Sequence, residues 1–186
     1  MPNIKDSRIL IMASDGFEQS ELLVPLNKLK AAGATVHVAT PDNKPIRGWN
    51  KKDWGETVPS DLAIAKVTVS DYDALVLPGG QINPDVLRAN ETAVGIVREF
   101  ASANKIVAAI CHATWLLVEA GIAAGRELTS YHSIKTDVKN AGATWVDKEV
   151  VVDDGIITSR SPDDLPAFVA KIIEEVEEGR HVRKVA

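Results

Sequence analysis

A chain of 186 residues has room for one well-packed domain, and its 45% hydrophobic and 25% charged residues exclude a disordered or fibrous protein. The formal net charge of -5 argues against a nucleic-acid-binding face, because phosphate binding needs clustered Lys and Arg. No apolar run approaches the roughly 20 residues that span a bilayer, and residues 1–6 lack a signal-peptide pattern. The single cysteine excludes an internal disulfide and favours a reducing, cytoplasmic location.

Short β-branched runs alternate with helical stretches, which predicts a mostly parallel sheet with helices on both faces, in one domain over 1–186. The segment over 40–70 is irregular and carries Trp49 and Trp54, which we expect at a pocket rim or a subunit contact. In the first half of the chain, the pattern predicts a strand over 8–12, a helix through 22–29 ending at Gly33, a strand over 35–39, a hairpin at 57–58 and 63–65, a strand over 73–77 and a helix over 92–103. In the second half, it predicts a strand over 106–110, a helix over 113–120, a strand over 127–129, a helix over 134–140, strands over 150–152 and 156–158, and a helix over 165–178. A charged, solvated tail is expected from Arg180.

Cys111 ends the most apolar predicted strand, and the chain turns directly into a helix after it. This placement resembles the strand–nucleophile–helix turn of hydrolases. The positive end of a helix favours a thiolate over a thiol, so the position suits a nucleophile. The alternative is a buried structural cysteine that acts as a small hydrophobic residue. The position favours the nucleophile.

Three further features fall at the same edge of the predicted sheet, where open α/β sheets bind their ligands. His112 is a candidate base for Cys111, or else a polar residue of the first helical turn. Glu18 could hold a proton against the sulfur anion, or else favour the start of the next helix through its charge. Gly79 and Gly80 could supply oxyanion-binding N–H groups, or form a plain turn. The four histidines and one cysteine show no metal-ligand spacing, so neither a metal nor a cofactor is expected.

Together these segments resemble the ThiJ/PfpI family of intracellular proteases and deglycases, within the superfamily of class I glutamine amidotransferases. The resemblance rests on residues 109–113, 15–18 followed by Glu21-Leu22, 77–80, 137–143 and 158–166, in order over nearly the whole chain. Amidotransferase chemistry is not expected, because Ser161-Pro162-Asp163 has no histidine where that class carries its base.

The resemblance implies a flavodoxin-like three-layer sandwich with the nucleophile on a strained elbow, in a homodimer or a ring of dimers. It implies that Glu18 contacts the thiol of Cys111 and that His112 completes the site. It further implies that an acidic residue after the glycine turn, Asp85 here, reaches the histidine of a neighbouring subunit. Aspartate is one methylene shorter than the glutamate more familiar at this position.

Three functions follow from this resemblance. The first is a cofactor-independent enzyme that acts on reactive dicarbonyls or on their adducts with proteins, in stress protection. The second is a cysteine peptidase, which would depend on the contact between Asp85 and His112. The third is a non-enzymatic redox sensor or chaperone that uses Cys111. No membrane or nucleic-acid partner is expected.

Overall fold

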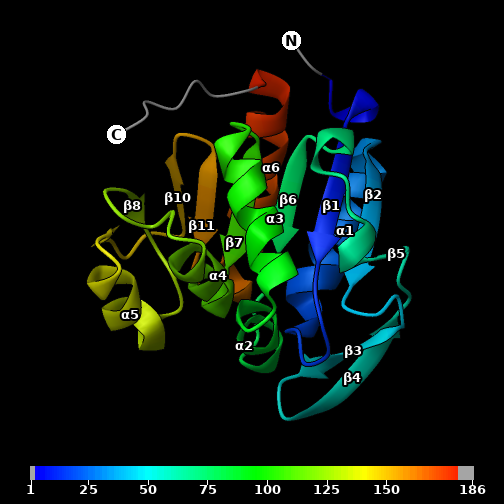
Figure 1. Ribbon diagram of the computed structural model, residues 1–186, viewed down its shortest axis with the longest axis horizontal. Helices are drawn as coiled ribbons and strands as arrows, with labels where there is room; N and C mark the ends of the chain where they lie inside the picture. Colours follow the sequence, from blue (N-terminus) through cyan, green and yellow to red (C-terminus); the bar gives the residue numbers. More distant parts are fainter. Residues whose placement is uncertain (1–2, 180–186) are drawn as a thin grey trace.

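The computed structural model describes residues 3–179, so the predicted tail from Arg180 and residues 1–2 lie outside the described part of the chain. A seven-stranded sheet in the order β10-β11-β7-β6-β1-β2-β5 forms its centre (Figure 1). Neighbouring strands are parallel except for β10, which pairs antiparallel with β11. The strands of this sheet are β1 (Arg8–Met12), β2 (Thr35–Thr40), β5 (Leu62–Ala63), β6 (Ala74–Leu77), β7 (Ile106–Ile110), β10 (Val150–Asp153) and β11 (Ile156–Ser159).

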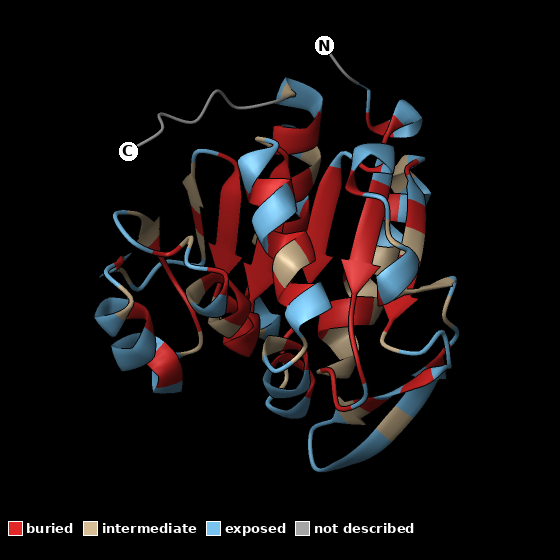
Figure 2. Ribbon diagram, viewed as in Figure 1, coloured by how far each residue is buried: buried red, intermediate tan, exposed pale blue. Residues whose placement is uncertain are grey.

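Helices cover both faces of the sheet, which is why β6 and β7 are apolar and buried along their length, as is β1 after Arg8 (Figure 2). Alternate residues of β1 enter two different cores, because successive side chains of a strand point to opposite faces. The helices are α1 (Gln19–Ala32), α2 (Ile82–Arg88), α3 (Glu91–Ser102), α4 (Thr114–Glu119), α5 (Lys135–Asn140) and α6 (Leu165–Glu178). Ile9 and Ile11 of β1 pack with α1 and α6, and Leu10 and Met12 pack with α3 and α4.

The predicted flavodoxin-like architecture is confirmed, and the bounds of β1, β7 and α6 match their predictions. The end of α1 follows from its sequence: Gly33 adopts φ 106, and its N–H bonds the last turn of the helix. The turn between β10 and β11 is also as expected, with Asp154 and Gly155 at positive φ.

A hairpin forms in the irregular segment, but the prediction that it pairs residues 57–58 with 63–65 is wrong. The antiparallel pair is β3 (Ile46–Asn50) with β4 (Asp53–Val58), and it brings Trp49 opposite Trp54. Leu62–Ala63 instead adds a short edge strand parallel to β2. The β3–β4 hairpin projects from the carboxyl end of the sheet (Figure 1).

Two further elements differ from the prediction. The short helix α2 was not predicted, because Asn83-Pro84 near its start is more typical of a loop. The strand predicted over 127–129 is β8 (Glu127–Leu128), which pairs with β9 (Thr144–Trp145) in a separate small sheet.

Candidate active site

Cys111 lies on a strained elbow between β7 and α4. Its φ is 64, a left-handed conformation that residues other than glycine rarely adopt. A single 3-10 turn, η4 (Cys111–Ala113), then leads into Thr114 and the helix. The elbow implied by the resemblance is therefore present, and it places Cys111 at the carboxyl edge of the sheet, where the residue lines a cavity.

The sharp turn folds the side chain of His112 back onto its neighbour. Its Nδ1 lies 3.2 Å from the Sγ of Cys111, and its Nε2 lies 3.2 Å from the Oγ of Ser133. The ring stacks on Tyr131 at 4.7 Å between centroids and meets the edge of Trp115 at 5.2 Å. Burial, and then the nearby His132, lower the pKa of His112, so the ring is neutral and able to accept a proton.

The expected contact between Glu18 and the thiol is wrong: Glu21 makes it. Glu18 is the residue just before α1, and its half-exposed carboxylate accepts a hydrogen bond from the hydroxyl of Ser20. Glu21, one helical turn further along, points inward and is fully buried. Its Oε2 accepts a hydrogen bond of 2.8 Å from the N–H of Gly79. The direction of the side chain in the first turn of α1 decides between the two acids.

Glu21 holds a proton at neutral pH. Burial raises its pKa to about 8, against the lowering effect of the Gly79 hydrogen bond. Its Oε1 accepts from no donor in the described chain, as is expected of an oxygen that carries the proton itself. A protonated Glu21 therefore adds no negative charge beside Cys111, with whose side chain it interacts.

The thiol of Cys111 is the resting form. Burial, and then the charge that Glu21 carries when ionised, raise the pKa of Cys111. The backbone N–H groups of Gly80 and His112 point at the sulfur and lower that pKa. A neutral Glu21 removes the opposing charge, so a thiolate forms most readily when Glu21 is protonated and His112 accepts the thiol proton.

The glycine turn contributes in two different ways. The N–H of Gly79 already donates to Glu21. The prediction that Gly79 is an oxyanion donor is therefore wrong in this structure. A Cβ at Gly79 would lie 2.5 Å from Glu21 Oε2 and 2.7 Å from the Cβ of Cys111, so this position has no room for a side chain. Gly80 adopts φ 82, and its N–H faces the sulfur, as an oxyanion donor would.

These groups open into a cavity of about 550 Å³. Its rim includes Trp49, which the chain holds beside the site through a 2.7 Å hydrogen bond from its N–H to the carbonyl of Phe17. Asp85 is not among the residues that line it; it is exposed on α2, next to Ile82 and Val86. The cavity is lined by Gly16, Glu18, Glu21, Trp49, Lys51, Gly80, Gln81, Ile82, Cys111, His112, Tyr131 and Pro162.

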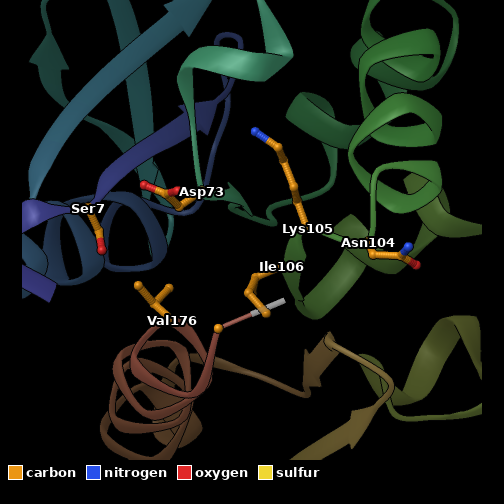
Figure 3. A pocket seen from close by; sticks show the side chains of 7 residues that line it. Ser7, Asp73, Asn104, Lys105, Ile106 and Val176 are labelled. Atoms are coloured by element: carbon orange, nitrogen blue, oxygen red, sulfur yellow. The ribbon is translucent and has the colours of Figure 1, made fainter. Parts of the chain in front are cut away.

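A second, smaller cavity of about 120 Å³ lies at the opposite edge of the sheet, where Ser7, Asp73 and Lys105 precede β1, β6 and β7 (Figure 3). Lys105 there donates to the carbonyls of Val69 and Tyr72, which is a structural arrangement. Within residues 3–179, no group of three or more metal-ligating side chains forms, and no helix is long and apolar enough to cross a membrane.

The model of the DJ-1/PfpI family matches residues 7–175, and the chain belongs to this family. A deglycase of Thermococcus kodakarensis is 44% identical over 167 residues, covering 90% of this chain and 98% of the relative. Protein/nucleic acid deglycase 2 of Escherichia coli is 42% identical over 163 residues, covering 87% and 92%. General stress protein 18 of Bacillus subtilis is likewise 42% identical over 163 residues, covering 87% of this chain and 92% of the relative.

Solved structures agree with the family. A two-domain protein of Anabaena variabilis, with DJ-1/ThiJ/PfpI-like and ferritin-like domains, has a TM-score of 0.88 at 34% identity. The match covers 92% of this chain but 48% of that one, so this chain spans about half of that protein. DJ-1beta of Drosophila melanogaster has a TM-score of 0.82 at 31% identity, with 92% and 94% covered.

Sequence reasoning missed Glu21, Tyr131 and Ser133. Glu21 had a signal, since it lies at helical spacing from Glu18 in the same segment of the family resemblance. Tyr131 and Ser133 follow a two-residue strand in a turn, where no periodicity shows which side chain faces the site.

Proposed function

We propose that the chain is a cofactor-independent, cysteine-dependent deglycase that acts on dicarbonyls or on their adducts with amines and thiols. One observation carries the proposal: His112 and a protonated Glu21 both lie beside the sulfur of Cys111, which lines a cavity of about 550 Å³. Such a site can activate a thiolate and donate a proton next to it without a metal. The names of the relatives support deglycase chemistry.

The reaction begins when the thiol proton of Cys111 passes to Nδ1 of His112. The thiolate attacks the former aldehyde carbon of the adduct, and the bond between that carbon and the amine breaks. The amine leaves with the proton that Nδ1 of His112 took from the thiol, so that a hemithioacetal remains on the sulfur. The N–H groups of Gly80 and His112 face the developing oxyanion. A proton then moves from the first substrate carbon to the second, through His112 or Glu21, and gives a thioester. Water releases a hydroxy acid and restores the thiol.

The test compares the native protein with Cys111→Ala, which removes the single thiol of the chain. Free methylglyoxal is followed by lactate formation, and a peptide glycated beforehand on arginine or lysine is followed by recovery of the free side chain. We expect both products from the native protein and neither from Cys111→Ala. Recovery of the side chain no faster than spontaneous dissociation would limit the activity to free dicarbonyls, and absence of both products would refute the proposal.

A peptidase is the second candidate, and the Cys111–His112 pair is the observation in its favour. In that reaction the same thiolate attacks an amide carbonyl, and His112 protonates the leaving amine. Fluorogenic peptides cleaved by the native protein, with loss of cleavage in Cys111→Ala and no hydroxy acid from dicarbonyls, would favour the peptidase.

We also infer a homo-oligomer in the cytoplasm. Ile82 and Val86 are large apolar side chains exposed on α2 at 43% and 46%, and Asp85 lies between them. An exposed apolar patch of this kind is typical of an interface. A second copy docked on it would bring Asp85 toward the neighbouring site, as the resemblance implies.

A further inference from the structure

Both ring nitrogens of His112 have a neighbour within the same chain. Nδ1 faces the Sγ of Cys111 at 3.2 Å, and Nε2 faces the Oγ of Ser133, also at 3.2 Å. His112 as a whole is only 4% exposed, so solvent has little access to either nitrogen. In a neutral imidazole one nitrogen carries the hydrogen and the other accepts, and these two neighbours decide which is which.

Ser133 is held in this place by the backbone. Its 3-10 turn, η5 (His132–Ile134), follows Tyr131, whose N–H donates a 3.2 Å hydrogen bond to the carbonyl of Cys111. The ring of Tyr131 also stacks on His112. The serine is therefore attached to the nucleophile turn by one hydrogen bond and one ring contact, although it is 22 residues further along the chain.

We propose that Ser133 is a positioning residue: its hydroxyl oxygen accepts the Nε2–H of His112 and thereby leaves the lone pair of Nδ1 for the thiol proton of Cys111. This inference rests on the proposed function only in taking Cys111 as the nucleophile. A serine fills this role differently from an acid, because it adds no negative charge beside the ring. It selects the tautomer without making a permanent imidazolium.

The proton balance follows from this arrangement. At rest, the thiol donates to Nδ1 and Nε2–H donates to Ser133. On activation the thiol proton moves to Nδ1, the sulfur becomes a thiolate, and Nε2–H keeps its acceptor. The resting thiol and the lowered pKa of His112 agree with this starting state. The titratable and charged groups that face the ring or its direct neighbours are Cys111, Glu21, Tyr131, His132, Asp137 and Arg88, the last two through Trp115.

The test uses two readouts that need no substrate. Nitrogen-15 NMR of the ring of His112, assigned with His112→Asn, reports the tautomer. The rate of alkylation of the single cysteine by iodoacetamide, followed against pH, reports formation of the thiolate. Ser133→Ala removes the acceptor, and Ser133→Thr keeps a hydroxyl. Ser161→Ala is the control, because this serine lines a neighbouring cavity and is not one of the two partners of the His112 ring nitrogens. Circular dichroism checks that each variant is folded.

We expect the native ring to carry its hydrogen on Nε2 and Ser133→Ala to show both tautomers. Alkylation of Ser133→Ala at neutral pH should slow about fivefold, the effect of one lost neutral hydrogen bond. Ser133→Thr should restore the native rate, and Ser161→Ala should keep it. Ser133→Asp should move the alkylation profile to lower pH, because a carboxylate favours the imidazolium.

A native tautomer and a native alkylation profile in Ser133→Ala would overturn the inference. So would a native ring with its hydrogen on Nδ1. If dicarbonyl turnover is absent but Ser133→Ala shifts both readouts, the proposed function fails and the role of Ser133 stands.

Discussion

Glu21 makes the stability of the protein depend on pH in a predictable direction. Its pKa is raised from 4.5 to about 8 in the folded state, chiefly by burial. The folded chain therefore binds a proton that the unfolded chain has lost between these values. The stabilisation is fully present below the unfolded pKa and is lost as pH rises through the folded one.

The free energy of unfolding should thus fall by up to about 1.4 kcal/mol for each pH unit in this window. Glutamine cannot ionise. Between pH 5.5 and pH 8.5 the free energy of unfolding of Glu21→Gln should therefore fall by about 2 to 4 kcal/mol less than that of the native protein. Urea unfolding at the two pH values measures this difference. Glu18→Gln is the matched control and should follow the native curve more closely, since Glu18 is half-exposed. Parallel pH dependence in the native protein and Glu21→Gln would contradict a proton on Glu21.

At the scale of elements, the turn after β6 is built around the absence of a side chain. A Cβ at Gly79 would meet Glu21, Cys111 and the carbonyl of Ile110, at 2.5, 2.7 and 2.7 Å. Cys111 and Ile110 belong to the strained elbow, so the backbone there cannot move away from a new side chain without distorting the site. Gly79→Ala should therefore destabilise the fold by more than about 2 kcal/mol and slow alkylation of Cys111.

Gly95 offers a matched comparison for Gly79. It lies inside α3, and a Cβ there would meet nothing within 4 Å. Gly95→Ala should raise stability by about 0.5–1 kcal/mol, because alanine favours the helix. Thermal unfolding of the two variants gives both results; a mild Gly79→Ala would show that the elbow is less tightly packed than the distances indicate.

The β3–β4 hairpin should contribute to substrate binding rather than to the chemical step. Trp49 lines the cavity mouth, while Trp54, its partner across the hairpin at 5.6 Å between centroids, is 40% exposed. Trp49→Ala should raise KM for a glycated peptide severalfold, on the order of 1 kcal/mol of binding, and leave kcat near the native value. Trp54→Ala is the control, with little change expected in either constant. A loss confined to kcat in Trp49→Ala would assign the residue a different role.

Elements with strong periodicity were predictable, and contacts between distant segments were not. The bounds of β7 and α6 can be read in the sequence, because every residue of β7 is buried and the buried residues of α6 recur at helical spacing. The elbow at Cys111 follows from its place after such a strand. By contrast, Glu18 and Glu21 differ only in the direction of their side chains around the first turn of α1, which depends on how that helix packs. Ser133 reaches His112 through a backbone bond between Tyr131 and Cys111, and residue types do not reveal that bond.

At the scale of the whole molecule, the proposed assembly would act through the face of α2 beside the cavity. Ile82 lines the cavity mouth, and Val86 and Asp85 continue the same face outward. If a second copy covers this face, part of the cavity rim is an interface, and assembly controls access to Cys111. A carboxylate placed on this face should therefore act on both assembly and activity.

If the proposed homo-oligomer forms through this face, Val86→Glu should convert it to a smaller species, because a charge in an apolar interface loses its solvation without a partner. Light scattering after gel filtration measures the mass, and Trp54→Glu, a charge added at an equally exposed apolar residue away from α2, should leave it native.

Asp85→Asn separates the two roles of this face. If Asp85 of one subunit assists His112 of the next, turnover should fall about tenfold or more while the mass stays native. Native turnover in Asp85→Asn would instead leave Ser133 as the partner of Nε2, so that the nucleophile, the base and the group that orients the base would all come from one chain.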